Sequence, residues 1–135
     1  MTEVVTSILE NNSEILLLKR SQNVRTYPGC WSGVSGYLEG NEPPIDRAYQ
    51  EILEELGLQD SQLDFLRTAE PIKFTDRIEE IEQEWIVHPF LFHSHSRIIN
   101  LDWENIEYAW ISPSSVKSLK TVPKLLDVLR GLDVR

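Results

Sequence analysis

The strongest constraint on the fold is the segment PIDRAYQEILEEL, residues 44–56, which has the periodicity of an amphipathic helix. Pro43 and Pro44 lie at its first turn, where a missing N–H is tolerated, and Gly57 follows its last residue as a C-cap. The segment therefore predicts one capped helix with a side that must be covered by the rest of the protein. That predicted core-facing stripe consists of Ile45, Ala48, Tyr49, Ile52 and Leu56, extended by Leu53.

Strand patterns lie before and after this helix, so the chain is predicted to be an α/β protein with a mixed sheet and helices packed on its faces. Residues 3–10 and 15–21 predict an opening hairpin around a turn at 11–14. Two short helices are expected at 112–119 and 122–132, each with a Pro near its start. The remaining expected strands lie around 31–34 and at 63–74, 79–92 and 106–112. The strands at 63–74 and 79–92 are expected to pair antiparallel and to be joined near 75–80.

Length and composition bound the domain organisation and the partners. One domain over residues 1–135 is expected, because 135 residues that are 41% apolar and 26% charged can bury a core. The net charge of −9 argues against long nucleic acid as a partner, since phosphate contacts need clustered Lys and Arg. The lone Cys30 excludes an intramolecular disulfide. The sequence has no signal-peptide pattern, and its apolar runs are far shorter than the roughly 20 residues that span a bilayer. We therefore expect a soluble, cytoplasmic protein with no membrane partner.

Three glutamates, Glu51, Glu54 and Glu55, are predicted to lie together on the side of the helix opposite the apolar stripe. They are related as i, i+3 and i+4, so they are neighbours whose repulsion costs about a few tenths of a kcal/mol per pair. A solvated helix face is the ordinary interpretation of such a cluster. The alternative is a site for a hard divalent cation such as Mg²⁺, which takes oxygen ligands and would turn the repulsion into binding.

The residues before the helix favour the cation site. The full pattern is G36-x5-E42-x7-Q50-E51-I52-L53-E54-E55-L56-G57-L58. It resembles the Nudix box, G-x5-E-x7-R-E-U-x-E-E-x-G-U, in which U is an apolar aliphatic residue, and only the Arg is replaced, by Gln50. The match covers residues 36–58, and a looser resemblance extends over the whole chain. The resemblance implies a Nudix-like α/β/α sandwich.

The resemblance also implies an activity. Nudix enzymes hydrolyse a nucleoside diphosphate linked to another moiety, and they do so with Mg²⁺ or Mn²⁺. We therefore expect a pyrophosphohydrolase that acts on a nucleoside diphosphate derivative, such as a nucleoside triphosphate or ADP-ribose. Bound cations would screen the diphosphate and lower the pKa of an attacking water. By resemblance, Glu51, Glu54 and Glu55 would hold the metals, and the main-chain carbonyl of Ser35 would join them.

The residue that deprotonates the water is expected among acidic side chains. One of the helix glutamates, Glu51 or Glu54, would serve, or an acid on a loop before the last strand, as in many relatives. The loop offers Asp102, Glu104 and Glu107, and the spacing to Trp110 favours Glu104.

Gln50 is the one departure within the box. The usual Arg can form a bidentate pair with the carboxylate beside it, whereas Gln carries no charge. Arg47 lies one turn before Glu51, and we hypothesise that it supplies the missing charge; an ordinary i,i+4 surface pair is the alternative. Gln50 also keeps a second function open, a weakly active or inactive Nudix-like module that binds a nucleotide or a protein. A structural domain with a chance acidic face is the third.

Further candidates for substrate binding lie between the first two strands and the box. Arg20 and Arg25 flank a loop near the expected cleft, where they would meet phosphate oxygens or remain solvated cations. Trp31 could stack on a base, although packing is favoured by about two to one for a Trp in such a position. Tyr27 has the same two interpretations.

Two other features have ordinary explanations. His93 and His95 share one face of a predicted strand, but no third ligand is spaced to join them, which argues against a zinc site. The apolar face of residues 122–132 predicts packing of a helix on its own domain, and a homodimer contact is the alternative.

Overall fold

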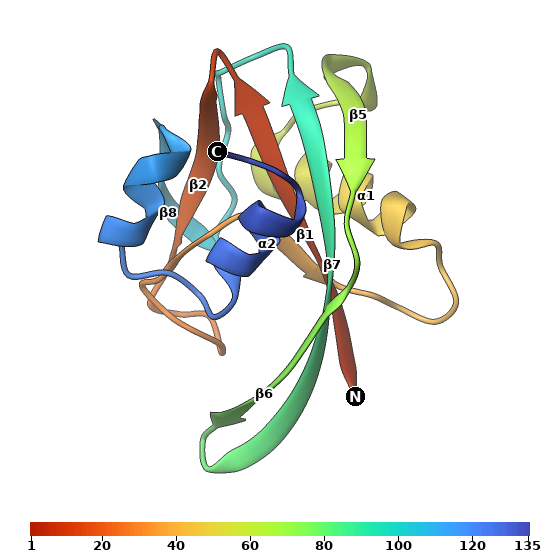
Figure 1. Ribbon diagram of the computed structural model, residues 1–135, viewed down its shortest axis with the longest axis vertical. Helices are drawn as coiled ribbons and strands as arrows, with labels where there is room; N and C mark the ends of the chain where they lie inside the picture. The colour runs from red at the N-terminus through yellow and green to blue at the C-terminus, as the bar shows by residue number, and fades with distance from the viewer.

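The computed structural model describes residues 1–135 and contains one eight-stranded mixed sheet with helices on both faces (Figure 1). β1 and β7 pair in parallel, and the other strand pairs are antiparallel. The predicted α/β/α arrangement is confirmed. In chain order the elements are β1 (Thr2–Asn11), β2 (Glu14–Arg20), β3 (Trp31–Ser32), β4 (Val34–Tyr37), α1 (Pro44–Leu56), the 3-10 helix η1 (Asp60–Gln62), β5 (Leu63–Thr68), β6 (Ile72–Ile78), β7 (Ile81–Ser94), β8 (Asn105–Ile111), the 3-10 helix η2 (Pro113–Ser118) and α2 (Leu125–Gly131).

β1 is the centre of the sheet, because it pairs with β2, β4 and β7. Its successive side chains point to opposite faces, and both faces are covered, so residues 5–9 are all buried. Val5 and Leu9 belong to the core cluster under α1, whereas Ile8 belongs to the cluster under α2. The two helices therefore cover opposite faces of one sheet.

Helix α1 has the predicted bounds, Pro44–Leu56, and it ends as the sequence indicates. Gly57 is left-handed, with φ 73°, and its N–H donates to the Leu53 carbonyl at 3.0 Å, which is a glycine C-cap. The prediction was wrong for two side chains. Leu53 is 37% exposed, and Glu55, expected on the solvated side, is only 3% exposed. Glu55 lies about two turns after buried Ala48, so both project from nearly the same side of the helix.

The region after α1 differs from the two long strands that were predicted. The first predicted strand, 63–74, is two strands, β5 and β6, because Pro71 lies between them and cannot donate to a ladder. β6 then extends through most of the predicted turn to Ile78. The turn itself is Glu79–Glu80, and both residues have positive φ, 53° and 66°, as a two-residue hairpin turn with primed geometry requires.

Smaller differences concern short elements. The strand predicted around 31–34 is divided into β3 and β4, and the first short C-terminal helix is the 3-10 helix η2. The second is α2, which packs its apolar face on the sheet as predicted: Leu125, Val128 and Leu129 are buried in the second core cluster. None of the helices has the length and apolar character needed to cross a membrane.

Candidate metal-binding active site

The carboxylates of α1 face the sheet edge formed by β4. Gly36 on β4 lies directly beneath Glu51: a Cβ at this position would overlap the Glu51 carboxylate. Gly36 is therefore required for close approach of the strand to the helix rather than for an unusual φ. This contact turns Glu51 toward the interior of the site, and Glu54, one turn further along α1, is exposed beside it.

Glu55 is the buried carboxylate of the site. Asn105, the first residue of β8, donates its Nδ2 hydrogen to Glu55 Oε1 at 3.1 Å. The second oxygen, Oε2, is buried and has no hydrogen-bond partner. Burial raises the pKa of Glu55 well above its usual value, and the nearby Glu104 and Glu51 raise it further. A buried carboxylate with a free oxygen and acidic neighbours is costly unless a cation joins it.

The acids of the β7–β8 loop lie close to those of α1. The pKa of Glu104 is raised by burial, by Asp102 and by Glu54, and Arg20 opposes this shift. The pKa of Asp102 is raised chiefly by burial, although its Oδ1 accepts the Glu104 N–H at 3.1 Å. The pKa of Glu51 is raised by burial and by Glu54. The structure thus brings together the predicted acids Glu51, Glu54, Glu55 and Glu104, whereas Glu107 is exposed on β8.

These observations fit a hard divalent cation. The donors are carboxylate oxygens, which Mg²⁺ and Mn²⁺ prefer. The pKa values of Glu51, Glu55 and Glu104 are raised, as expected for buried carboxylates with acidic neighbours, and one buried oxygen is left unpaired. The residues present therefore suit the metal that the sequence pattern implies.

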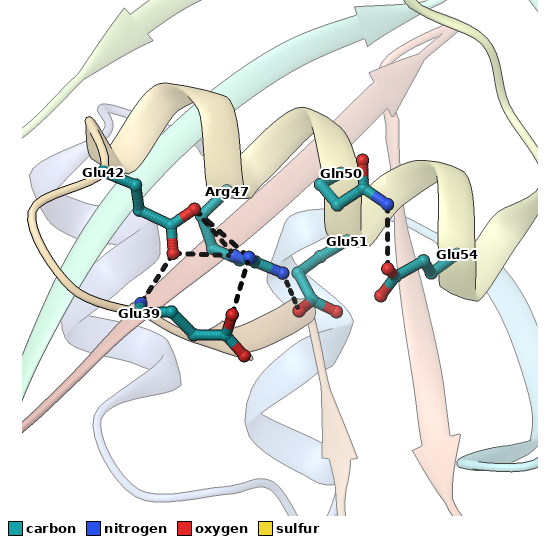
Figure 2. Close-up of polar contacts among 6 residues, drawn as sticks. All are labelled: Glu39, Glu42, Arg47, Gln50, Glu51 and Glu54. Atoms are coloured by element: carbon teal, nitrogen blue, oxygen red, sulfur yellow. Dashed lines mark hydrogen bonds and ion pairs between the residues drawn. The ribbon is translucent and has the colours of Figure 1, made fainter.

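Arg47 connects the loop before α1 to the first glutamate of the cluster (Figure 2). Its Nη1 donates to Glu51 Oε1 at 3.3 Å, and its Nε donates to Glu42 Oε2 at 3.1 Å. A third carboxylate, Glu39, lies 3.5 Å from Nη2. Glu42 also accepts the Glu39 N–H at 2.6 Å, so it braces the loop, and Arg47 lowers its pKa.

Gln50 does not face Glu51. Its Nε2 donates to Glu54 Oε1 at 2.8 Å, one turn further along α1 (Figure 2). The only cation in contact with the Glu51 carboxylate is therefore Arg47. This contact is the one required by the hypothesis that Arg47 supplies the charge missing at position 50.

A cavity opens beside the carboxylates. Glu51 and Glu104 line it, together with Ser35 and Arg20. Arg20 is held in place because its Nε donates to the Thr26 carbonyl at 2.9 Å. The cavity thus presents a cation and carboxylates to the same space, which suits a phosphorylated ligand bound through metal.

Aromatic side chains line the same cavity. Trp85 stacks with Tyr37 and with Phe74, with ring centroids 6.3 Å apart in each pair. Tyr27 also lines the cavity, and its hydroxyl donates to Asp76 Oδ2 at 2.7 Å. Burial and this bond raise the pKa of Tyr27, so the phenol stays neutral. Flat apolar surfaces beside a phosphate-binding region suit a nucleobase.

Two predicted substrate-binding residues lie elsewhere. Arg25 is exposed and does not line the cavity. Trp31 packs against the core cluster under α2, and its backbone pairs with Lys120 and Val122. The structure therefore does not bring either side chain to the carboxylates.

Sequence reasoning missed Asn105, Tyr37, Trp85 and Phe74. Asn105 and Tyr37 directly follow Glu104 and Gly36, so adjacency to predicted site residues was an available signal. No such signal was available for Trp85 and Phe74. They reach the cavity through pairing of distant strands, since Trp85 is opposite Thr2 in the parallel β1–β7 pair and opposite Phe74 in the β6–β7 pair.

The fold and this cluster define a Nudix-type hydrolase. The family model described as "NUDIX domain" matches residues 1–132, and the chain belongs to this family. It is thereby a Nudix-type pyrophosphohydrolase, and hydrolases of this family generally use divalent metals.

Individual relatives agree with this assignment. The nucleoside triphosphatase NudI of Escherichia coli is 28% identical over 123 residues, which cover 84% of this chain and 83% of the relative. The crystal structure of a MutT protein from Methanosarcina mazei has a TM-score of 0.77 and 26% identity, and the match covers 98% of this chain and 92% of that one. An Ap4A hydrolase from C. elegans has a TM-score of 0.76 over 98% of this chain and 96% of its own, but at 16% identity it shows the fold alone.

Proposed function

We propose that the protein is an Mg²⁺- or Mn²⁺-dependent hydrolase that cleaves the diphosphate linkage of a nucleoside diphosphate derivative, with nucleoside triphosphates as the first class to test. The observation that carries the proposal is the buried, unpaired Oε2 of Glu55 within a group of acidic side chains. The similarity to a nucleoside triphosphatase, NudI, supports the substrate class.

The glutamates of α1 would hold the metal. Glu51, Glu54 and Glu55 offer carboxylate oxygens, and Ser35, beside Gly36, lines the same cavity, where its carbonyl would join them. When bound, the cation screens the charge of the diphosphate and lowers the pKa of a nearby water.

The chain's own residues would bind the substrate and accept the proton. Glu104 is partly buried among acids, and its raised pKa suits a general base better than an ordinary glutamate would. Arg20, which faces Glu104 across the cavity, would bind phosphate oxygens. Arg47 would fix the orientation of Glu51.

The nucleoside would occupy the aromatic part of the cavity. Tyr37 and Phe74, whose rings stack on the buried Trp85, offer ring faces there, which would stack on a base irrespective of its identity. Arg25 and Trp31 remain predictions from the sequence that the position of the cavity does not support.

The remaining predictions concern the setting of the enzyme. We propose that residues 1–135 form one Nudix hydrolase domain that acts in the cytoplasm on a small molecule. Homodimerisation stays a prediction, since α2 buries its apolar face against its own sheet.

The experiment is product release from a panel of nucleoside triphosphates, ADP-ribose and related diphosphates with Mg²⁺ or Mn²⁺. Glu54→Gln should lower kcat by about 100-fold or more, because it removes an exposed metal ligand without disturbing the core. Asp46→Asn is the matched control: it removes one exposed acidic charge from the same helix and should leave kcat unchanged. Equal rates for the two variants would overturn the proposal. No release from any substrate, with metal still bound, would favour the binding module that Gln50 left open.

A further inference from the structure

A second group of metal-ligating side chains lies at the far end of β7, where three neighbouring strands meet. His93 on β7 is the direct partner of Glu10 on β1 and of Asp64 on β5. Side chains of paired residues in a sheet lie on the same face, a few ångströms apart. His95 follows His93 by two residues, just beyond the end of the strand.

The distances between these groups are those of potential ligands. His95 Nε2 lies 2.8 Å from Asp64 Oδ2, and the two imidazole rings have centroids 5.5 Å apart. One ligand atom each from Asp64, His93 and His95 lies within 4.8 Å of the other two. From the neighbouring strand β1, Glu10 Oε1 lies 3.5 Å from His93 Nδ1.

The prediction that no third ligand joins His93 and His95 was therefore wrong. It considered only ligands spaced near His93 and His95 along the chain. Asp64 is 31 residues before His95 and reaches it only because β5 and β7 pair antiparallel.

This group is separate from the active site. His93 has the same side-chain direction as Leu91, which belongs to the core cluster under α2, whereas Phe92 between them belongs to the cluster under α1. The imidazoles thus project from the sheet face opposite to α1, the face on which Val87 lines the active-site cavity. His93 lies six residues further along β7 than Val87, and none of the four residues lines the cavity.

We propose that Asp64, His93 and His95 form a second metal site, which takes a borderline divalent cation, Zn²⁺ first, rather than Mg²⁺. Two imidazoles and one carboxylate are a donor set that suits zinc and leaves a fourth position for water. The Glu10 carboxylate lies 3.5 Å from His93 Nδ1, where it can support the ring as a carboxylate beside a metal-binding histidine does. The metal ion bound at this second site links β5 to β7 and stabilises the folded protein, and it takes no part in hydrolysis.

His88 provides a matched control on the same strand. Its Nε2 lies 2.9 Å from Glu3 Oε1, so it also forms a histidine–carboxylate pair, but no second histidine or third ligand joins that pair. Removing a surface ion pair should therefore have the same effect at His88 and at His93, whereas removing a metal ligand should weaken metal binding only at the proposed site.

The test is calorimetric titration of Zn²⁺ into the Glu55→Gln variant, in which the active-site cluster is weakened, with excess Mg²⁺ present. One zinc ion should bind per chain and raise the melting temperature. Adding His93→Ala, His95→Ala or Asp64→Asn should weaken binding by about tenfold or more, and adding His88→Ala should not.

Unfolding in EDTA verifies that each variant is folded, which is expected because all four side chains are partly exposed. Two results would overturn the proposal. One is no zinc binding in the Glu55→Gln variant, and the other is the same affinity in the His93→Ala, His95→Ala and His88→Ala variants.

Discussion

The two helix-covered faces of the sheet differ in what their helices bury. Helix α2 contributes Leu125, Val128 and Leu129 to an apolar cluster and buries no charged group. Helix α1 contributes Ile52 and other apolar residues in the same way, but it also buries Glu55. Helix α2 itself is therefore a packing helix, although the sheet face that it covers also lines the active-site cavity, through Val87 and Phe74. The α1 face gives up some stability to keep an ionisable group inside, as expected of a functional site.

The largest difference between the faces should appear when the α2 face is truncated. Leu129→Ala removes a buried side chain, and we expect it to lower the free energy of unfolding by about 2–5 kcal/mol, with kcat of the folded protein unchanged. Urea unfolding and assays far below the melting temperature measure the two quantities. Leu126→Ala is the control on the same helix, since Leu126 is 43% exposed and should cost far less. Equal costs at the two positions would contradict the assignment of α2 as a packing helix.

Substitution of Glu55 on the α1 face should raise the free energy of unfolding instead of lowering it. Glu55→Gln replaces a buried carboxylate that has an unpaired oxygen, so we expect the free energy of unfolding in EDTA to rise by about 1–3 kcal/mol. In assays with Mg²⁺ or Mn²⁺, kcat should fall. Glu54→Gln should change the metal-free stability little, because Glu54 is exposed. Chemical denaturation in EDTA compares the variants. A less stable Glu55→Gln protein would show that the burial of this carboxylate is not a cost.

Arg47 and Gln50 should contribute unequally to the activity of the α1 face. Arg47→Ala removes the cation in contact with Glu51, and we expect kcat to fall by about tenfold, the scale of positioning contacts around a metal ligand. Gln50→Ala removes only a neutral hydrogen bond to the exposed Glu54 and should have a smaller effect. Steady-state kinetics with Mn²⁺ and partial rescue by Arg47→Lys distinguish positioning from folding. If Gln50→Ala proves the more damaging substitution, Arg47 does not compensate for the missing Arg.

The smallest effect concerns pH and Glu42, the brace of the loop before α1. Arg47 lowers the pKa of Glu42 in the folded protein below the ordinary value of 4.5. Its stabilising contribution is therefore fully present above the unfolded pKa and is lost as the pH falls through the folded pKa. Urea unfolding of wild type and Glu42→Gln should show a stability difference that is constant above about pH 5 and shrinks below pH 4.5. A difference that grows toward acid would have the wrong sign.

The sequence predicted the elements that are determined by residues close together in the chain. The bounds of α1 follow from Pro44 and the Gly57 cap, and the glutamate spacing identified the cluster. Features that depend on pairing between distant strands were missed, including the placement of Trp85 in the cavity and of Asp64 beside His95. The burial of Glu55 was missed for another reason. It was grouped with Glu51 and Glu54, although its spacing of seven residues from Ala48 places it near the buried side of the helix, where Asn105 and Glu104 from β8 and its preceding loop enclose it.

The most direct test of the account is the effect of Mg²⁺ and Mn²⁺ on unfolding of wild type and Glu55→Gln. A ligand that binds only the folded state stabilises it by about 2.7 kcal/mol at 100 times its Kd. We predict that metal raises the melting temperature of the wild type and that most of this increase disappears in Glu55→Gln, although the variant starts from the higher metal-free value. An equal increase in both proteins, or none in the wild type, would contradict the claim that the buried carboxylate of α1 is kept for a metal ion.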